Sequence, residues 1–150
     1  MRAIDTNVLV RLLVRDDALQ VAAAETFVER GAWVPTLAIA EAMRVLESVY
    51  AWSAAKQLVC LTMLLDHRDL VLQDSEVVAA ALAQFRERPS LGFSDCLMVE
   101  ICRKAGHVPM GTFDRKLGGL EGAQRIGERV AAKRGRTTVG ARSAAVIRLE

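Results

Sequence analysis

The chain opens with the stretch MRAIDTNVLV (residues 1–10), in which a short apolar run ends abruptly at an acid. The apolar residues as far as Ile4 are typical of a strand, and Asp5 follows it directly. Thr6 and Asn7 then lead into apolar residues at helical spacing. The stretch therefore predicts a strand, a tight turn and a helix start, and ligands bind at such strand ends in open α/β sheets. Helix capping by one of the three polar residues is the alternative explanation.

Strands and helices alternate along the chain after this first turn. Further strands are expected over residues 33–35, 70–72, 108–113 and 123–126, and helices over 8–14, 18–30, 36–51, 53–65, 74–85 and 94–104. Pro35 suggests that the strand at 33–35 lies near an edge of the sheet. The alternation predicts an α/β fold, in which helices cover both faces of a parallel sheet.

Length and charge divide the chain into a body and a tail. The 150 residues fit one domain, and the formal net charge is +2. Residues 127–150 hold six basic and two acidic residues, so residues 1–126 hold 14 basic and 16 acidic ones, a balance of −2. We predict a folded domain over 1–126 and a loosely held basic tail over 127–150, with a docked helix at 142–149 as the alternative. No apolar run is long enough to span a membrane and no signal peptide is recognisable, so we expect a cytoplasmic protein.

The three cysteines form no C-x-x-C pair, and neither histidine has metal-ligand spacing. These patterns favour buried thiols over disulfides or a zinc site.

Three further acids, Glu41, Asp95 and Asp114, occupy positions that a purely structural role explains poorly. Glu41 lies inside the helix that starts at residue 36, on a stripe with apolar neighbours, so we expect it to point inward and to be largely buried. Pairing with Arg44, three residues later, is the alternative. Asp95 opens a helix, and Asp114 ends a strand as Asp5 does; helix or turn capping is the alternative for each.

In a parallel α/β fold these four positions can converge on one edge of the sheet. Four carboxylates in one pocket would raise each other's pKa values unless cations were bound there. Oxygen-only ligands favour Mg²⁺, or alternatively Mn²⁺, over zinc. Such sites support phosphodiester hydrolysis with one or two metal ions.

Four blocks of this sequence look like the signature blocks of PIN-domain ribonucleases, and most of all like those of VapC toxins from bacterial toxin–antitoxin pairs. The blocks, in order along residues 1–126, are Asp5-Thr6-Asn7-Val8-Leu9, Leu37-Ala38-Ile39-Ala40-Glu41, Phe93-Ser94-Asp95-Cys96-Leu97 and Thr112-Phe113-Asp114-Arg115-Lys116-Leu117.

The resemblance implies a three-layer α/β/α fold with a central parallel sheet of about five strands. It also implies a Mg²⁺-dependent endoribonuclease that forms homodimers and is inhibited by a small antitoxin protein. Asp5 and Asp95 match the acids that hold the principal metal, and Glu41 and Asp114 match those that complete the site directly or through water. Polar groups that support the metal ligands are implied at three further positions, namely Thr6, Asn7 and Thr112.

Two positions depart from the family's pattern. Gly92 stands where many members have an additional acid, and Arg44 stands where an apolar or aromatic residue is common. Arg44 either contacts a substrate phosphate or shields Glu41. The basic tail lies outside the resemblance.

Basic residues close to the acids in sequence are the candidates for phosphate binding, with solvated surface charge as the alternative for each. These candidates are Arg11, Arg44, Arg115 and Lys116. Aromatic residues are scarce, at 5%, which favours recognition of RNA shape and backbone over base-by-base recognition.

Three other functions remain open at this point. The chain could be a PIN-like RNA- or DNA-processing nuclease outside a toxin pair, or a non-catalytic PIN-fold binding module. A phospho-receiver domain also uses acids at strand ends, but it requires a lysine that the last expected strand does not offer.

Overall fold

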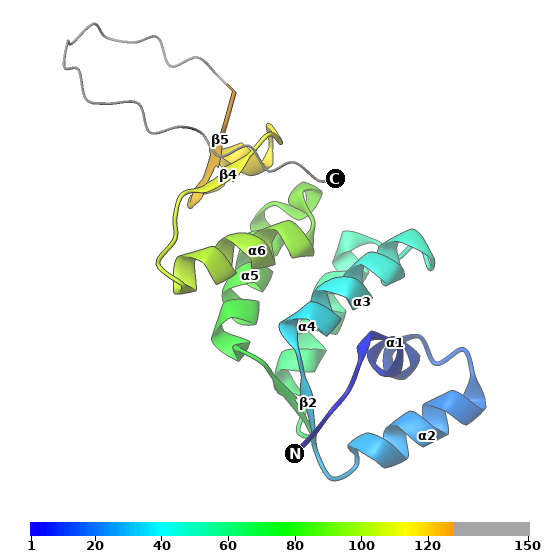
Figure 1. Cartoon of the computed structure of the whole chain (residues 1–150). Coiled ribbons are helices and arrows are strands. Elements are labelled where there is room, and N and C mark those ends of the chain that lie inside the picture. Colours follow the sequence, from blue (N-terminus) through cyan, green and yellow to red (C-terminus); the bar gives the residue numbers. More distant parts are fainter. Residues whose placement is uncertain (128–150) are drawn as a thin grey trace, which may run out of the picture.

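The computed structural model describes residues 1–127, and within them six α-helices alternate with five short strands and two 3₁₀ turns (Figure 1). The basic tail predicted over 127–150 and the alternative helix at 142–149 lie, apart from Gly127, outside the described residues. No helix within the described range is long and apolar enough to cross a membrane.

Three strands form the larger sheet. They are β1 (Arg2–Ala3), β2 (Ala32–Val34) and β3 (Leu70–Leu72), paired in parallel in the order β1-β2-β3. Trp33 lies opposite Ala3 on one side and Val71 on the other, so β2 is the central strand. The edge position predicted from Pro35 is therefore wrong. Pro35 falls one residue beyond the strand, at the start of the next helix, where its missing N–H removes no bond from the sheet.

The other two strands form a separate parallel pair, β4 (Met110–Thr112) and β5 (Ala123–Arg125). The α/β class and the parallel pairing are confirmed, but the single sheet of about five strands is corrected to one of three and one of two. β4 is also shorter than the predicted 108–113. Pro109 has no N–H to donate to a neighbouring strand, and this limits how far β4 can extend toward its amino end.

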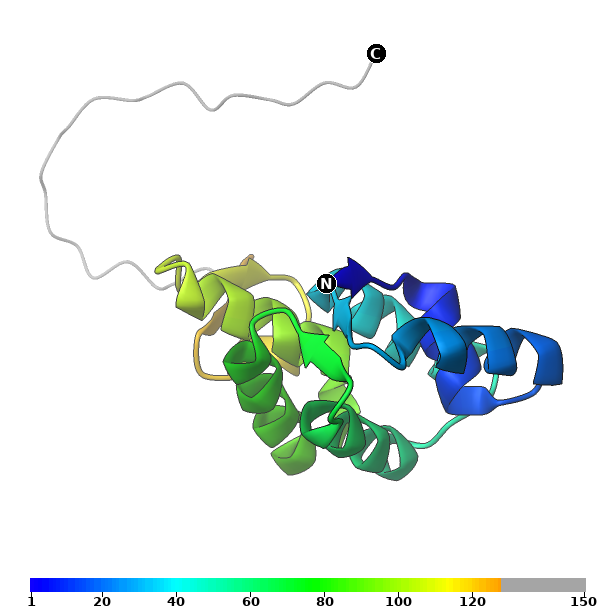
Figure 2. The same cartoon turned by 90° about the horizontal axis from the view of Figure 1, so that it is seen from below.

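The helices pack mainly on one another around these short strands. They are α1 (Thr6–Val14), α2 (Ala18–Val28), α3 (Thr36–Ser48), α4 (Ala54–Asp66), α5 (Ser75–Glu87) and α6 (Phe93–Lys104). α1 packs on α2 and α3, α3 packs on α6, and α5 packs on both α4 and α6. Figures 1 and 2 both place the β4–β5 pair at the opposite end of the molecule from α2.

Polar side chains cap the amino ends of three helices. Asp5, Asp17 and Ser53 each accept a hydrogen bond from a backbone N–H in the first turn of the helix that they precede. Thr36 is instead the first residue of α3, and its N–H donates to the side chain of Gln73 at 3.0 Å.

The core lies between the helices and the three-stranded sheet. Its fully enclosed side chains include Leu9, Ile39, Leu61 and Phe85, and the ring of Phe85 meets that of Phe93 edge to face at 6.2 Å. Two of the cysteines, Cys60 and Cys96, are buried as predicted, and burial raises the pKa of each thiol to about 11. They are protonated structural residues.

Candidate metal-dependent nuclease site

The first two acids are linked through a threonine. Ile4 separates Asp5 from β1, and the Asp5 Oδ1 accepts a hydrogen bond from the Val8 N–H at 2.9 Å, which fixes the start of α1. Thr6, the next residue, donates its hydroxyl proton to Glu41 Oε2 at 2.6 Å. α1 and α3 therefore hold Asp5 and Glu41 on the same side of the packed helices.

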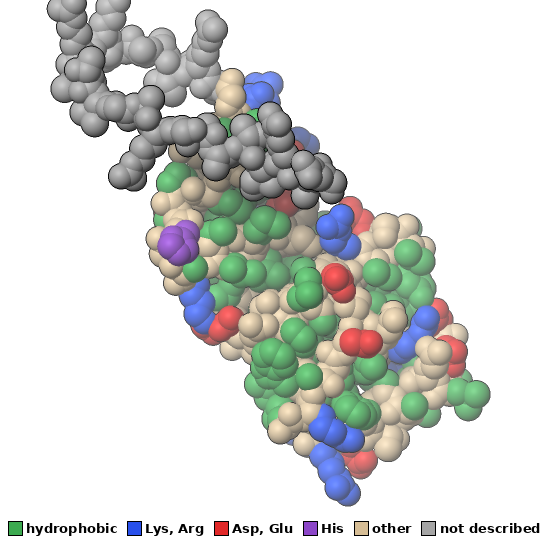
Figure 3. Space-filling view, viewed as in Figure 1, with side chains coloured by type: hydrophobic (Ala, Val, Ile, Leu, Met, Phe, Trp, Pro, Cys, Tyr) green, Lys and Arg blue, Asp and Glu red, His purple; other side chains and the backbone are tan. Residues whose placement is uncertain are grey.

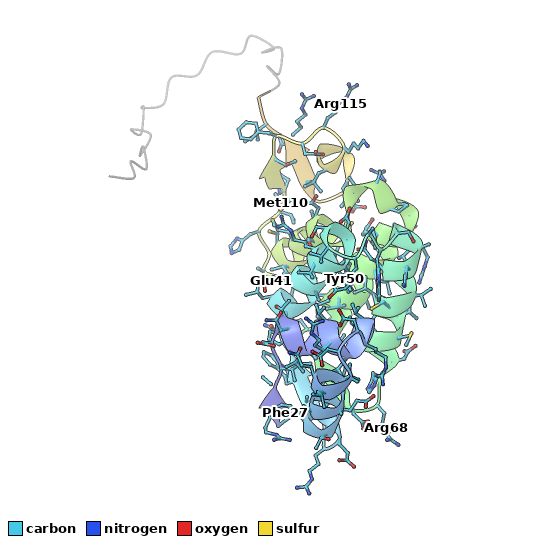
Figure 4. The ribbon with its side chains drawn as sticks, turned by 90° about the vertical axis from the view of Figure 1, so that its right-hand side faces the viewer. Phe27, Glu41, Tyr50, Arg68, Met110 and Arg115 are labelled. Carbon is cyan, nitrogen blue, oxygen red and sulfur yellow. The ribbon has the colours of Figure 1, made fainter. Side chains whose placement is uncertain are left out.

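Glu41 is exposed, which corrects the prediction of a largely buried carboxylate. Leu37, one turn earlier on the same stripe, is 67% exposed, so this part of α3 faces outward although its pattern resembles a core face. Figure 4 shows the labelled Glu41 at the surface of the molecule. Arg44 makes no ion pair with Glu41 within residues 1–127, so the predicted alternative of a Glu41–Arg44 pair is not observed.

The other two acids interact with each other. Asp95 is half-buried in the first turn of α6, and Asp114 follows β4. Burial raises the pKa of the Asp95 carboxyl, the negative charge of Asp114 raises it further, and the Arg44 guanidinium lowers it. The two carboxylates are thus close enough to repel, with one cationic side chain nearby.

Asp114 is held by its own turn. Its Oδ1 accepts from the Leu117 N–H at 2.6 Å, and its own N–H donates to Thr112 Oγ1 at 3.1 Å. The Thr112 hydroxyl therefore holds the backbone of the turn that carries Asp114, and its support of a metal ligand stays a prediction. The turn-capping alternative for Asp114 is observed, because its carboxylate accepts from the Leu117 N–H.

The two pairs come from neighbouring helices. Ser94 Oγ, adjacent to Asp95, donates to the carbonyl oxygen of Ala40, adjacent to Glu41, at 3.4 Å. In the part of the chain that the structure describes, however, no three Asp, Glu, His or Cys side chains are placed closely enough to hold one ion together. The acids are therefore arranged as two pairs, Asp5 with Glu41 and Asp95 with Asp114.

The donor chemistry of these residues fits Mg²⁺. All four are carboxylates, no histidine or cysteine stands among them, and hard oxygen ligands of this kind suit Mg²⁺ or Mn²⁺. The repulsion between Asp95 and Asp114 is what a cation would relieve.

The basic candidates differ in their surroundings. Arg11 forms an ion pair with Asp16 and donates hydrogen bonds to Gln20, at 2.7 Å, and to the Tyr50 hydroxyl. Its guanidinium is therefore already paired within the protein. Arg44, Arg115 and Lys116 are exposed and form no ion pair within residues 1–127. Asn7 is exposed and lines a shallow apolar groove between α1 and α2.

A cavity of about 520 Å³ adjoins Asp95 and was not predicted from the sequence. Arg44 and Glu47 of α3 lie on one wall, Trp52 and Gln57 on another, and the start of α6 closes it. One feature of the sequence could have indicated this cavity. Gln57 lies on the same helical stripe as Leu61 and Leu64, and a polar side chain on a buried apolar stripe of α4 is unusual.

Neither a curated protein nor a solved structure matches the chain significantly. The family model of the PIN domain does match, over residues 3–122. This range includes all four acids and ends just before β5. The chain therefore belongs to the PIN-domain family.

Proposed function

We propose that this protein is a Mg²⁺-dependent endoribonuclease, the toxin of a VapBC-type toxin–antitoxin pair. PIN domains are generally nucleases and typically use divalent metal ions, which gives the coarser class. The observation that carries the proposal is the pairing of two exposed or half-buried carboxylates on α1–α3 with two more at the start of α6 and the end of β4.

Asp5 and Asp95 are the residues that would hold the principal ion, with Glu41 and Asp114 completing the site. When bound, Mg²⁺ supplies charge neutralisation at the scissile phosphate and lowers the pKa of the attacking water. The chain's own polar groups do the positioning. The Thr6 hydroxyl fixes one oxygen of Glu41, and the Thr112 hydroxyl holds the turn that carries Asp114.

Substrate binding is assigned to the exposed cations around these acids. Arg44 lies beside Asp95, and Arg115 and Lys116 directly follow Asp114. Guanidinium and ammonium groups at these positions can contact phosphates on either side of a cleaved bond. Arg11 is left out of this role because its partners within the fold already satisfy it.

Cleavage of a cellular RNA pool by the purified protein tests this proposal. Discrete fragments are expected with Mg²⁺, and none with EDTA or with the Asp95→Asn variant. Asp66→Asn is the matched control, because Asp66 is an exposed acid at the end of α4, away from the site. Full cleavage by Asp95→Asn would contradict the proposal. Cleavage of flapped or duplex DNA in preference to RNA would favour a processing nuclease, and no cleavage by folded protein would favour a binding module.

The antitoxin and homodimer parts of the proposal are supported by apolar surface around the acids. Leu37 and Met98 are 67% and 51% exposed, each about one turn from an acid of the site. Figure 3 shows hydrophobic side chains around acidic ones near the middle of the face seen in Figure 1. Exposed apolar side chains of this kind are typical of protein interaction surfaces.

Expression in a bacterial host tests the toxin role. The wild-type chain should arrest growth, and Asp95→Asn should not. Unimpaired growth with soluble, RNA-cleaving protein would refute the toxin role while leaving the nuclease assignment intact.

A further inference from the structure

The cavity beside Asp95 has a polar floor that the proposed reaction does not yet use. Gln57 is only 5% exposed, and its side-chain N–H donates to the Trp52 carbonyl oxygen at 3.2 Å. A carbonyl oxygen only accepts, so this bond fixes the orientation of the amide and turns the Gln57 Oε1 away from Trp52.

The Gln57 Oε1 has no hydrogen-bond donor among the described residues. No fully enclosed side-chain nitrogen or oxygen in residues 1–127 is left without a partner. The Gln57 Oε1 is therefore reachable from outside, and Gln57 lines the cavity beside Asp95. A nearly buried acceptor thus opens into that cavity.

The other polar groups of the wall are arranged asymmetrically. Ser53 and Ser94 already bond to the backbone, as cap of α4 and as donor to Ala40. Glu47 has no partner among the described residues and offers a second acceptor. Arg44 is the cation of the cavity wall and lies beside Asp95. Glu47 and Arg44 therefore lie on the α3 side of the cavity and Gln57 lies on the α4 side, with the positive charge of Arg44 beside Asp95.

We propose that this cavity binds one nucleobase next to the scissile phosphate and selects bases that carry an exocyclic amino group. This inference rests on the proposed ribonuclease function. Arg44 contacts the phosphate beside Asp95, and the base enters the cavity, where the Gln57 Oε1 and the Glu47 carboxylate accept from its amino group. Adenine, cytosine and guanine each carry an exocyclic amino group, whereas uracil carries only carbonyl oxygens outside its ring. The volume of about 520 Å³ lies within the range of roughly 300–1,000 Å³ found for small-molecule sites.

Uridine is therefore disfavoured at one fixed position beside the cleaved bond. A buried acceptor left without a donor lowers binding by roughly ten-fold. The proposal adds recognition of one base to the recognition of RNA shape and backbone that the sequence favours.

A cleavage experiment measures the selection directly. A randomised RNA is digested with wild-type protein, with Glu47→Gln and with Gln57→Met, and the new ends are sequenced. Uridine should be depleted about ten-fold at one position with wild type, and this depletion should shrink in both variants. Glu29→Gln, on the exposed end of α2, is the matched control and should keep the wild-type pattern. An equal uridine frequency with wild type, or an unchanged depletion in both variants, would overturn the proposal.

A binding experiment gives an answer even if no RNA is cleaved. The chain has two tryptophans, so Trp33→Phe leaves Trp52, on the cavity wall, as the single tryptophan, and excitation at its red edge reports on it alone. Titration with CMP, AMP or UMP in EDTA should quench this fluorescence, with a Kd about ten-fold higher for UMP. Adding Glu47→Gln to the reporter protein should reduce that difference, and because Glu47 is exposed the protein should still fold.

Equal affinity for the three nucleotides, or no quenching, would overturn the base-binding proposal whether or not the protein is a nuclease. Nucleotide binding with the expected preference but no Mg²⁺-dependent cleavage would refute the proposed function and leave the cavity assignment standing.

Discussion

The candidate site takes its acids from two regions that differ in how well their side chains are buried, the three-stranded sheet and the β4–β5 pair. β2 and β3 contribute four buried side chains to the core, namely Ala32, Val34, Leu70 and Leu72. No residue of β4 or β5 is buried, and that region is held mainly by Leu117 and Leu120. Asp5 and Glu41 therefore stand on the well-packed part of the molecule, and Asp114 stands on a thinly packed one. Loss of core packing and loss of the site should be separable by mutation.

The region around Asp114 is fastened by hydrogen bonds from side chains. Arg88 Nη1 donates to the Gly119 carbonyl oxygen at 3.0 Å, and Arg103 Nη2 donates to that of Glu121 at 2.8 Å. Arg103 also pairs with the buried Glu100 at 3.3 Å. These bonds connect the segment after Asp114 to α5 and α6 without adding much buried apolar surface, so its local stability is expected to be below that of the core.

Removal of a core ring should have the largest effect, and it should act on both regions together. Phe85→Ala deletes a side chain that is 1% exposed and loses its contact with Phe93. We expect the free energy of unfolding to fall by about 3–5 kcal/mol. Urea denaturation followed by circular dichroism measures this loss. A decrease below 1 kcal/mol would mean that the region around Phe85 is less tightly packed than the structure has it.

Crowding the β4–β5 region should have a smaller and local effect. A Cβ at Gly118 would lie 2.7 Å from the Arg125 Cβ and 3.0 Å from its backbone nitrogen, so Gly118→Ala must displace β5. We expect a local destabilisation of about 1–3 kcal/mol. Amide hydrogen exchange should become faster in β4 and β5 and stay unchanged in β2 and β3, and RNA cleavage should fall because Asp114 moves.

The neighbouring glycine provides the control for this change. A Cβ at Gly119 would meet only the end of the Arg88 side chain, at 3.7 Å, which is an ordinary contact. Gly119→Ala should leave exchange and cleavage near wild type. If both alanine variants behaved alike, the close approach of Gly118 to β5 would not be what holds Asp114.

On the well-packed side, the Thr6 hydroxyl should matter for activity more than for stability. Thr6→Val keeps the shape of the side chain and removes the 2.6 Å bond to Glu41. Removal of a group that orients a metal ligand typically lowers activity by about 10- to 100-fold, and we expect the lower end of this range because Glu41 is exposed. Thr6→Ser retains the hydroxyl and should retain most of the cleavage rate. Equal rates for the valine and serine variants would remove Thr6 from the site.

The contrast between the two regions also explains how far the sequence could predict the molecule. The turn at Asp5, the helix starts at Asp17 and Ser53 and the order of the elements depend on local spacing, and the structure has them as expected. The exposure of Glu41 was mispredicted because an apolar stripe on α3 is the same in sequence whether it faces the core or a binding surface. The split of the sheet was missed because pairing between strands of two or three residues depends on long-range packing.

The smallest expected effect is a pH dependence of stability, which arises from Asp95 and its interaction with Asp114 of the other region. Burial and the Asp114 charge raise the pKa of Asp95 in the folded chain, so its ionised form is disfavoured by folding. In EDTA, the stability of wild type should therefore decline slightly as the pH rises from the unfolded pKa of aspartate through the raised folded pKa, and then level off.

The Asp95→Asn variant lacks this carboxyl group, so its thermal midpoint should exceed that of wild type. The difference should be smallest at about pH 3 and largest at about pH 7, because the Asp95 carboxyl loses its proton between these values. Added Mg²⁺ should reverse the order by stabilising wild type alone, because binding to the folded state raises its apparent stability. Parallel pH profiles for the two proteins would mean that burial and the Asp114 charge do not raise the pKa of Asp95 on folding, and the proposed interaction between the two regions would be refuted.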